Sequence, residues 1–188
     1  EHVIRALTRE LNIEQDFKIH NVKGKSNIRD ITDGLTASRD FRQNVESFCI
    51  ARDADNKPNN SFQKVSDALT NANLNSPNAP FQISNSNFAG KTRKIAVIIF
   101  PDGQSTGEIE DLLLGSVKNE PAMSCVDDYF QCIKASLQRM PNKMKKAKAR
   151  AFLASKKELK LSGEAAYEGY WDLNDPAFNP IRELLLSL

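Results

Sequence analysis

The spacing of apolar residues predicts that helices and strands alternate along the first part of the chain. Apolar residues recur every three or four positions over residues 1–12, which predicts an amphipathic helix. Apolar and polar residues alternate over Asp16–Val22, which predicts a short strand. A loop that begins at Lys23 then leads into a helix whose apolar stripe runs from Ile28 to Leu35.

Two continuous apolar runs predict the central strands. They cover Val45–Arg52 and Ile95–Phe100, and the second is the most apolar strand of the chain. Between them, Ser61 is placed to cap a helix that reaches Asn73. The connection that follows is rich in Asn, Ser and Pro, and it predicts one short edge strand at Phe81–Ile83.

After a helix that begins near Glu108, the rest of the chain is predicted to be helical. The expected helices cover residues 122–139, 143–157, 162–168 and 178–187. Alternating helices and strands predict an α/β fold with an open, mostly parallel sheet flanked by helices. We therefore expect an α/β core over residues 1–120 and a helical C-terminal part over 121–188. The chain starts in helical register without a methionine, so we also expect a first strand upstream.

Composition restricts the class of protein. In 188 residues, 40% are hydrophobic and 27% are charged, as in ordinary globular proteins. The three cysteines form no CxxC motif, which predicts reduced thiols in the cytoplasm and no zinc site. Cys125 and Cys132 lie seven positions apart on one helix, so we expect both to face the core. No apolar stretch approaches the ~20 residues of a membrane span, so we expect no membrane partner.

Two carboxylates follow the first central strand in the stretch FCIARDADNKPNN. In an extended chain, residues two apart point to the same side, so Asp53 and Asp55 are expected to share a face. Two close carboxylates repel each other unless a cation lies between them, and Mg²⁺ commonly binds one or two carboxylates together with water and phosphate. The stretch predicts a Mg²⁺ or Mn²⁺ site, although a solvated acidic turn explains it equally well.

The second central strand ends in a similar way, in the stretch FPDGQSTGEIED. Asp102, Glu108, Glu110 and Asp111 follow it, and acids in a first helical turn also suit the helix dipole. Neighbouring parallel strands end at one edge of a sheet, so we expect the two acidic stretches to lie side by side. That arrangement favours metal-assisted phosphoryl or phosphodiester transfer.

A basic segment over residues 139–160 suggests a nucleic-acid partner. It contains nine Lys or Arg and one acid, Glu158, so its net charge is +8 while the whole chain carries +2. Such a segment could follow the phosphate backbone of DNA or RNA, or form a solvated helix packed on the domain. Tyr167, Tyr170 and Trp171 could stack on bases, but an aromatic anchor for the C-terminal helix is the favoured interpretation.

Four stretches together resemble a small stand-alone Toprim-like family of prokaryotes: EHVIRAL, DADNKPNNSFQ, PDGQSTGEIEDLLL and YEGYWDLNDPAFNPIRELL. The resemblance covers nearly the whole chain and implies a compact α/β fold that holds Mg²⁺ with a glutamate and an Asp-x-Asp pair. It identifies Asp53 and Asp55 as that pair and implies that the glutamate lies upstream of Glu1. The related overcoming-lysogenization-defect nucleases imply a further acid, matched here by Glu108 or Glu110, and a lysine, matched by Lys148.

The resulting hypothesis is a Mg²⁺-dependent Toprim-type nuclease or phosphodiester-transfer protein. Asp53, Asp55, Asp102 and Asp111 are the candidate metal ligands, and Glu108, Glu110 and Lys148 are the candidate catalytic residues. The alternative is a non-catalytic Toprim scaffold that serves a partner ATPase in phage defence or repair. A receiver or phosphatase domain is a weaker third hypothesis, because the lysine that receivers require has no good match. The sequence does not determine the oligomeric state.

Overall fold

The chain divides into two compact units, and each is described by itself. The computed structural model describes residues 1–22 and 28–188. Residues 23–27, where a loop was predicted, lie outside the described residues. The helical unit comprises Glu1–Phe17 and Glu108–Asn179, and the sheet unit comprises Lys18–Gly107 and Pro180–Leu188. The domain boundary predicted near residue 120 stays a prediction.

The sheet unit contains a three-stranded mixed sheet in the order β1-β3-β2. The strands are β1 (Ser47–Asp53), β2 (Ile83–Phe88) and β3 (Lys91–Phe100). The β1 and β3 strands are parallel, with Phe48 opposite Ile95, whereas β2 runs antiparallel to β3. The α/β class is therefore confirmed, but a mostly parallel sheet is not, because β2 and β3 form a hairpin.

Two of the predicted strands differ from the observed ones. The alternating stretch Asp16–Val22 does not form a strand: the 3₁₀ helix η1 (Glu14–Asp16) includes its first residue, and residues 17–22 pair with no strand among the described residues. Alternation alone is insufficient, because a strand requires a hydrogen-bonded partner. The edge strand expected at Phe81–Ile83 begins instead at Ile83 and continues to Phe88. Its sequence ISNSNF is polar, so the apolar pattern did not reveal it.

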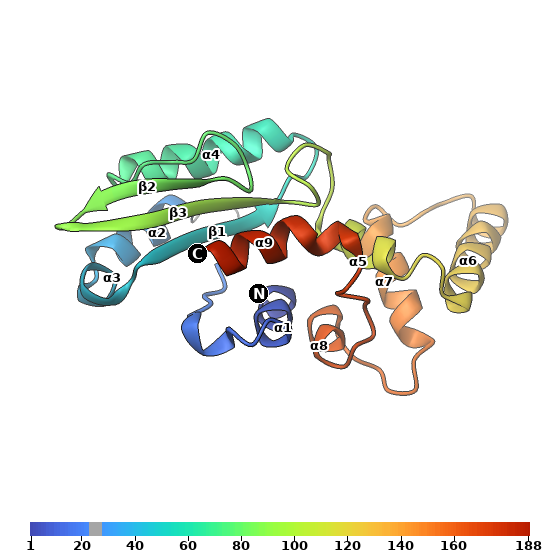
Figure 1. Cartoon of the computed structure of the whole chain (residues 1–188). Coiled ribbons are helices and arrows are strands. Elements are labelled where there is room, and N and C mark those ends of the chain that lie inside the picture. Colours follow the sequence, from blue (N-terminus) through green and yellow to red (C-terminus); the bar gives the residue numbers. More distant parts are fainter. Residues whose placement is uncertain (23–27) are drawn as a thin grey trace. The chain divides into compact units, whose positions relative to one another are not determined.

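Among its described residues, the sheet unit contains most or all of the helices α2 (Ile28–Ala37), α3 (Arg39–Asn44), α4 (Pro58–Asn71) and α9 (Asn179–Ser187). Figure 1 shows α4 and α9 on opposite sides of the sheet. On the α4 side, Val65 and Leu69 pack against Ile95, Val97 and Ile99 of β3. The predicted helices are confirmed, but α4 begins at Pro58 rather than Ser61. Proline suits the first helical position, and the Ser61 hydroxyl instead donates to the Ala54 carbonyl (3.0 Å).

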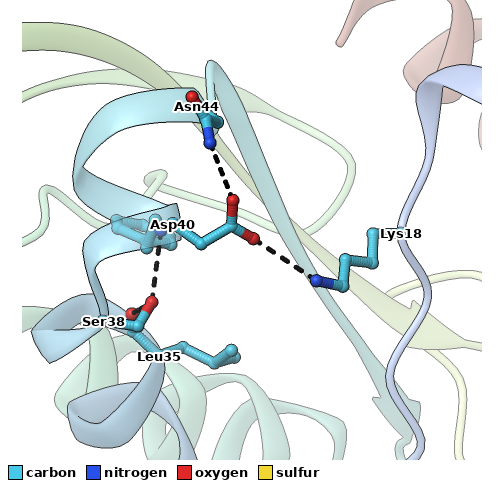
Figure 2. Close-up of polar contacts among 6 residues, drawn as sticks. Lys18, Leu35, Ser38, Asp40 and Asn44 are labelled. Atoms are coloured by element: carbon cyan, nitrogen blue, oxygen red, sulfur yellow. Dashed lines mark hydrogen bonds and ion pairs between the residues drawn. The ribbon is translucent and has the colours of Figure 1, made fainter.

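The short α3 helix is fixed by local polar contacts, which Figure 2 shows. Ser38 caps its N-terminus by accepting a hydrogen bond from the Phe41 amide (3.2 Å). The Asp40 carboxylate accepts one from the Asn44 amide (2.9 Å) and pairs with Lys18 (3.3 Å). These two partners hold the pKa of Asp40 below its ordinary value. The contacts tie the segment at Lys18 to α3 within the sheet unit.

The helical unit is built from α1 (His2–Glu10), η1, α5 (Ile109–Ser116), α6 (Pro121–Leu137), α7 (Met144–Ala154), α8 (Ser162–Tyr167) and η2 (Pro176–Phe178). The α-helices agree with the predicted ones, whereas the two 3₁₀ helices η1 and η2 were not predicted. Its core includes the Phe152 and Trp171 rings, whose centroids lie 5.1 Å apart. Trp171 is buried and its indole N–H donates to the Ser162 carbonyl (3.0 Å), so it is a core residue of the helical unit. Its predicted role as an anchor for the C-terminal helix stays a prediction.

The prediction for the cysteines of α6 was wrong. Cys125 and Cys132 are both exposed, and Met123, Val126 and Phe130 form the buried face of α6 instead. A spacing of seven places two residues on one face of a helix but does not decide which face is buried.

Candidate functional site

The carboxyl ends of β1 and β3 lie at the same edge of the sheet, as predicted. Asp53 is the last residue of β1 and lies opposite Phe100, the last residue of β3. The Ala54 amide then donates to the Phe100 carbonyl (2.9 Å), which extends the pairing by one residue. The half-buried Asp53 therefore stands where open α/β sheets commonly bind ligands.

Asp55 is positioned by a different backbone conformation than we expected. Its φ of 55° lies in the left-handed region, so the extended chain ends before it. The rule that residues two apart share a face therefore does not fix the direction of its side chain. Its backbone is held by Gly107, because each amide donates to the other residue's carbonyl (2.9 and 2.8 Å).

The loop over residues 101–107 is consequently anchored at both ends to residues 54 and 55. Within it, the Gly103 φ of 83° and the close approach of Pro80 favour glycine: an added Cβ would lie 2.9 Å from the Pro80 Cβ. The Asp102 carboxylate accepts hydrogen bonds from the Gln104 and Ser105 amides (2.9 and 2.6 Å) and from the Ser105 hydroxyl (2.7 Å). Asp102 thus stabilises its own loop, and Ser105 serves this turn rather than capping α5.

The same hydrogen bonds predict how Asp102 affects stability as pH changes. Partial burial, the largest single influence, raises the pKa of Asp102, but the bonds from Ser105 and Gln104 together outweigh it and hold the pKa below its ordinary value near 3.8. A lowered pKa stabilises the folded state above that ordinary value, and the stabilisation is lost as pH falls through the folded-state pKa. Asp102→Asn should therefore destabilise the sheet unit at pH 7 and much less at pH 3, as measured by urea denaturation. Ser105→Ala should give a smaller change with the same pH dependence, and a pH-independent effect would contradict this assignment.

The other acidic candidates belong to the helical unit and form ion pairs with lysines of α7. Lys146 lies 3.2 Å from Glu108 and 3.9 Å from Glu110, and Lys145 lies 2.8 Å from Asp111. Asp111 also accepts a hydrogen bond from the Glu108 amide (2.9 Å) at the start of α5. Helix capping and α5–α7 pairing therefore account for these acids within their own unit, and their proposed catalytic or metal-binding roles stay predictions.

Most of the basic segment is neutralised by acids that the linear sequence separates from it. Lys148 pairs with Asp127, and Lys156 pairs with Glu120 (2.6 Å). Ion pairs are formed by six of the nine basic residues: Lys143, Lys145, Lys146, Lys148, Lys156 and Lys160. The net charge of +8 counted along the segment therefore does not become a continuous stripe of unpaired cations, which weakens the argument for phosphate-backbone contact.

The residues that follow β1 offer few ligands for a metal ion. Among residues 1–22 and 28–188, no three His, Cys, Asp or Glu side chains lie close enough together to hold one. Burial raises the pKa of the Cys49 thiol in β1 to about 12, so this thiol stays protonated at neutral pH and is a poor ligand. Mg²⁺ at Asp53 and Asp55 would therefore complete its shell with water and substrate oxygens, as is common for this ion.

Sequence reasoning passed over Arg52, which directly precedes Asp53. Its Nη1 atom is buried and donates a hydrogen bond to no acceptor among the described residues. A cation beside the acidic pair is visible in the sequence ARDAD, but alternation in β1 places Arg52 and Asp53 on opposite faces of the strand.

Comparisons with known proteins identify a family but no function. A family model described as "Protein of unknown function (DUF3226)" matches residues 1–188. No curated protein and no solved structure matches the chain. Within the described part of the chain, none of the helices has the length and apolar character needed to cross a bilayer.

Proposed function

Because the chain belongs to the DUF3226 family, whose description assigns no activity, we propose a function from its site: a Mg²⁺-dependent, Toprim-like phosphodiester-transfer protein or nuclease that acts on DNA or RNA. The observation that carries the proposal is the anchoring of residues 101–107 to the end of β1. It brings the loop of Asp102 to the strand end that carries Asp53 and Asp55. The resemblance of DADNKPNNSFQ and PDGQSTGEIEDLLL to Toprim-like proteins supports the same assignment.

In this proposal Asp53 and Asp55 hold Mg²⁺ or Mn²⁺. The ion would neutralise phosphate charge and activate water when it is bound. Asp102 keeps its loop in place through Ser105 and therefore acts as a positioning residue. Glu108, Glu110 and Asp111 remain proposed contributors, and Lys148 remains a proposed catalytic lysine.

The alternative proposal is a non-catalytic module that keeps the scaffold and its metal and serves a partner ATPase. The pairing of Lys145, Lys146 and Lys148 with acids favours this alternative over direct binding of nucleic acid by the basic segment. Metal binding without hydrolysis of single- or double-stranded DNA or RNA would support it.

Both proposals require a metal ion at Asp53 and Asp55, so metal binding tests them together. We expect isothermal titration calorimetry of the full chain to detect Mg²⁺ or Mn²⁺, and the double variant Asp53→Asn, Asp55→Asn to lose that binding. The variant should fold normally, because asparagine has nearly the same size and shape as aspartate. Far-UV circular dichroism checks the fold.

A matched control removes two other carboxylates of the sheet unit. Asp30 and Asp67 are exposed on α2 and α4, so the double variant Asp30→Asn, Asp67→Asn should bind the metal as the wild type does. Equal loss of binding in both double variants would reflect net charge alone and would rule out a site at Asp53 and Asp55.

A further inference from the structure

The helical unit contains a cavity between α5, α6 and α7. Asp111 and Lys148, which have proposed roles above, line it, but Asp53 and Asp55 do not. The cavity volume is about 310 Å³, at the lower end of the ~300–1,000 Å³ range typical of small-molecule sites. This size suits a small metabolite better than a nucleotide or a peptide.

Two ion pairs line this cavity. Lys145 of α7 lies 2.8 Å from Asp111 of α5, and Lys148, one turn later on α7, pairs with Asp127 of α6. The lining therefore presents two carboxylates and two ammonium groups, and their charges balance. Lys145 and Asp127 are exposed, whereas Asp111 and Lys148 are half-buried. A ligand with a single charge would pair with one sign of group only and leave the half-buried group of the other sign to its original partner. A ligand that carries both charges can pair with groups of both signs.

The remaining lining is apolar and adaptable. Leu114 of α5 and Met123 of α6 are buried beside the cavity, and Met144 of α7 is half-buried there. Methionine is flexible and polarisable, so two methionines and a leucine can fit aliphatic groups of varied shape. The cavity thus combines balanced charges with an apolar surface large enough for one short side chain.

We propose that this cavity binds a free α-amino acid with an apolar side chain, of the leucine or methionine kind. The ammonium group of the ligand pairs with Asp111 or Asp127, its carboxylate pairs with Lys145 or Lys148, and its side chain contacts Leu114 and the methionines. Charge complementarity and the apolar lining both select this class of ligand over simple anions, cations or alkanes.

Gly115 provides a direct test, because it lines the cavity and has open space around it. A Cβ added at Gly115 would meet no atom within 4 Å, so a side chain can start from this lining position without a backbone clash, and Gly115→Leu adds bulk at the cavity wall. We expect calorimetry on the full chain in EDTA to detect L-leucine or L-methionine. Gly115→Leu should weaken that affinity at least tenfold.

Gly34→Leu is the matched control. Gly34 is also a helical glycine, it lies on α2 in the sheet unit, and an added Cβ there likewise meets no atom within 4 Å. This variant should bind the amino acid as the wild type does. The double variant Lys145→Gln, Lys148→Gln should also weaken binding at least tenfold, which provides a second test that does not depend on how Gly115→Leu packs.

Ligand analogues test the need for both charges. Isoamylamine lacks the carboxylate of leucine and 4-methylpentanoate lacks its ammonium group, so each should bind at least tenfold more weakly than leucine. The proposal is overturned if neither amino acid binds at millimolar concentration, or if Gly115→Leu binds like the wild type. The titrations contain EDTA, which removes Mg²⁺, and the Asp53→Asn, Asp55→Asn variant should still bind the amino acid. Failure to bind the amino acid would therefore not bear on the proposed metal site, and loss of the metal site would not affect the amino-acid proposal.

Discussion

Replacing Arg93 with methionine should destabilise the sheet unit by about 3 kcal/mol, because it removes the donor of one buried and three partly buried hydrogen bonds to carbonyl groups. Arg93 lies on β3 and its side chain is 0% exposed. Its guanidinium donates to the carbonyls of Phe41 (3.2 Å) and Arg42 (2.7 Å) in α3. It also donates to the carbonyls of Phe88 and Lys91 at the β2–β3 turn.

The surroundings of Arg93 stabilise its buried charge. Its guanidinium carbon lies 5.3 Å from the centre of the Phe41 ring and 5.6 Å from that of Phe88, so two aromatic faces also stabilise the charge. The α3 carbonyls lie in the last turns of that helix, where its dipole favours a cation. A buried ion pair can often be replaced by apolar residues without cost, but backbone carbonyls cannot be removed along with the arginine.

Hydrogen exchange of the β3 amides, residues 91–100, measures the effect within the sheet unit. Arg93→Lys should destabilise it as well, because an ammonium group cannot reproduce the planar fork that reaches both α3 and the turn. Arg39→Met is the control: Arg39 is exposed on α3 and donates to Gln43, so the change should stay within about 0.5 kcal/mol. Exchange rates in Arg93→Met equal to those of the control would contradict the structural role.

Trp171→Ala should destabilise the helical unit by about 3–5 kcal/mol, the usual cost of removing a large aromatic side chain from a core. Trp171 is 2% exposed and packs against Phe152, which is fully buried. Trp171→Phe should cost less, since it keeps an aromatic ring but leaves the Ser162 carbonyl without its indole donor.

Hydrogen exchange of the α7 amides, residues 144–154, measures the loss of stability in Trp171→Ala. Tyr129→Ala is the control, because Tyr129 is 55% exposed on α6 and its removal should change stability by no more than about 0.5 kcal/mol. If Trp171→Ala instead left stability unchanged and weakened binding of single-stranded nucleic acid, the base-stacking interpretation of Trp171 would replace the core-residue one.

The sequence by itself determined the main elements and the position of the acidic pair. The apolar run Ile95–Phe100 identified the buried part of β3, and apolar spacing identified every long helix to within a few residues. It also placed Asp53 at the end of a strand, because an apolar run that stops at acids and asparagines marks the edge of a sheet. These features depend on local order along the chain, which the sequence contains directly.

Only the tertiary structure decided which strands pair, which charged side chains form ion pairs, and which carbonyls accept hydrogen bonds from Arg93. The polar strand Ile83–Phe88 joins the sheet through backbone hydrogen bonds, which any side chain permits, so its sequence resembled a loop. Lys145 and Lys146 appeared to belong to a free basic stripe until folding brought α5 beside them. The charged stretch KTRK does not indicate that Arg93 is buried; α3 and the β2–β3 turn supply the carbonyls that accept hydrogen bonds from its guanidinium. Each of these contacts joins groups that are far apart in the chain. The free energy of such a contact depends on burial and geometry, which the local sequence pattern does not contain.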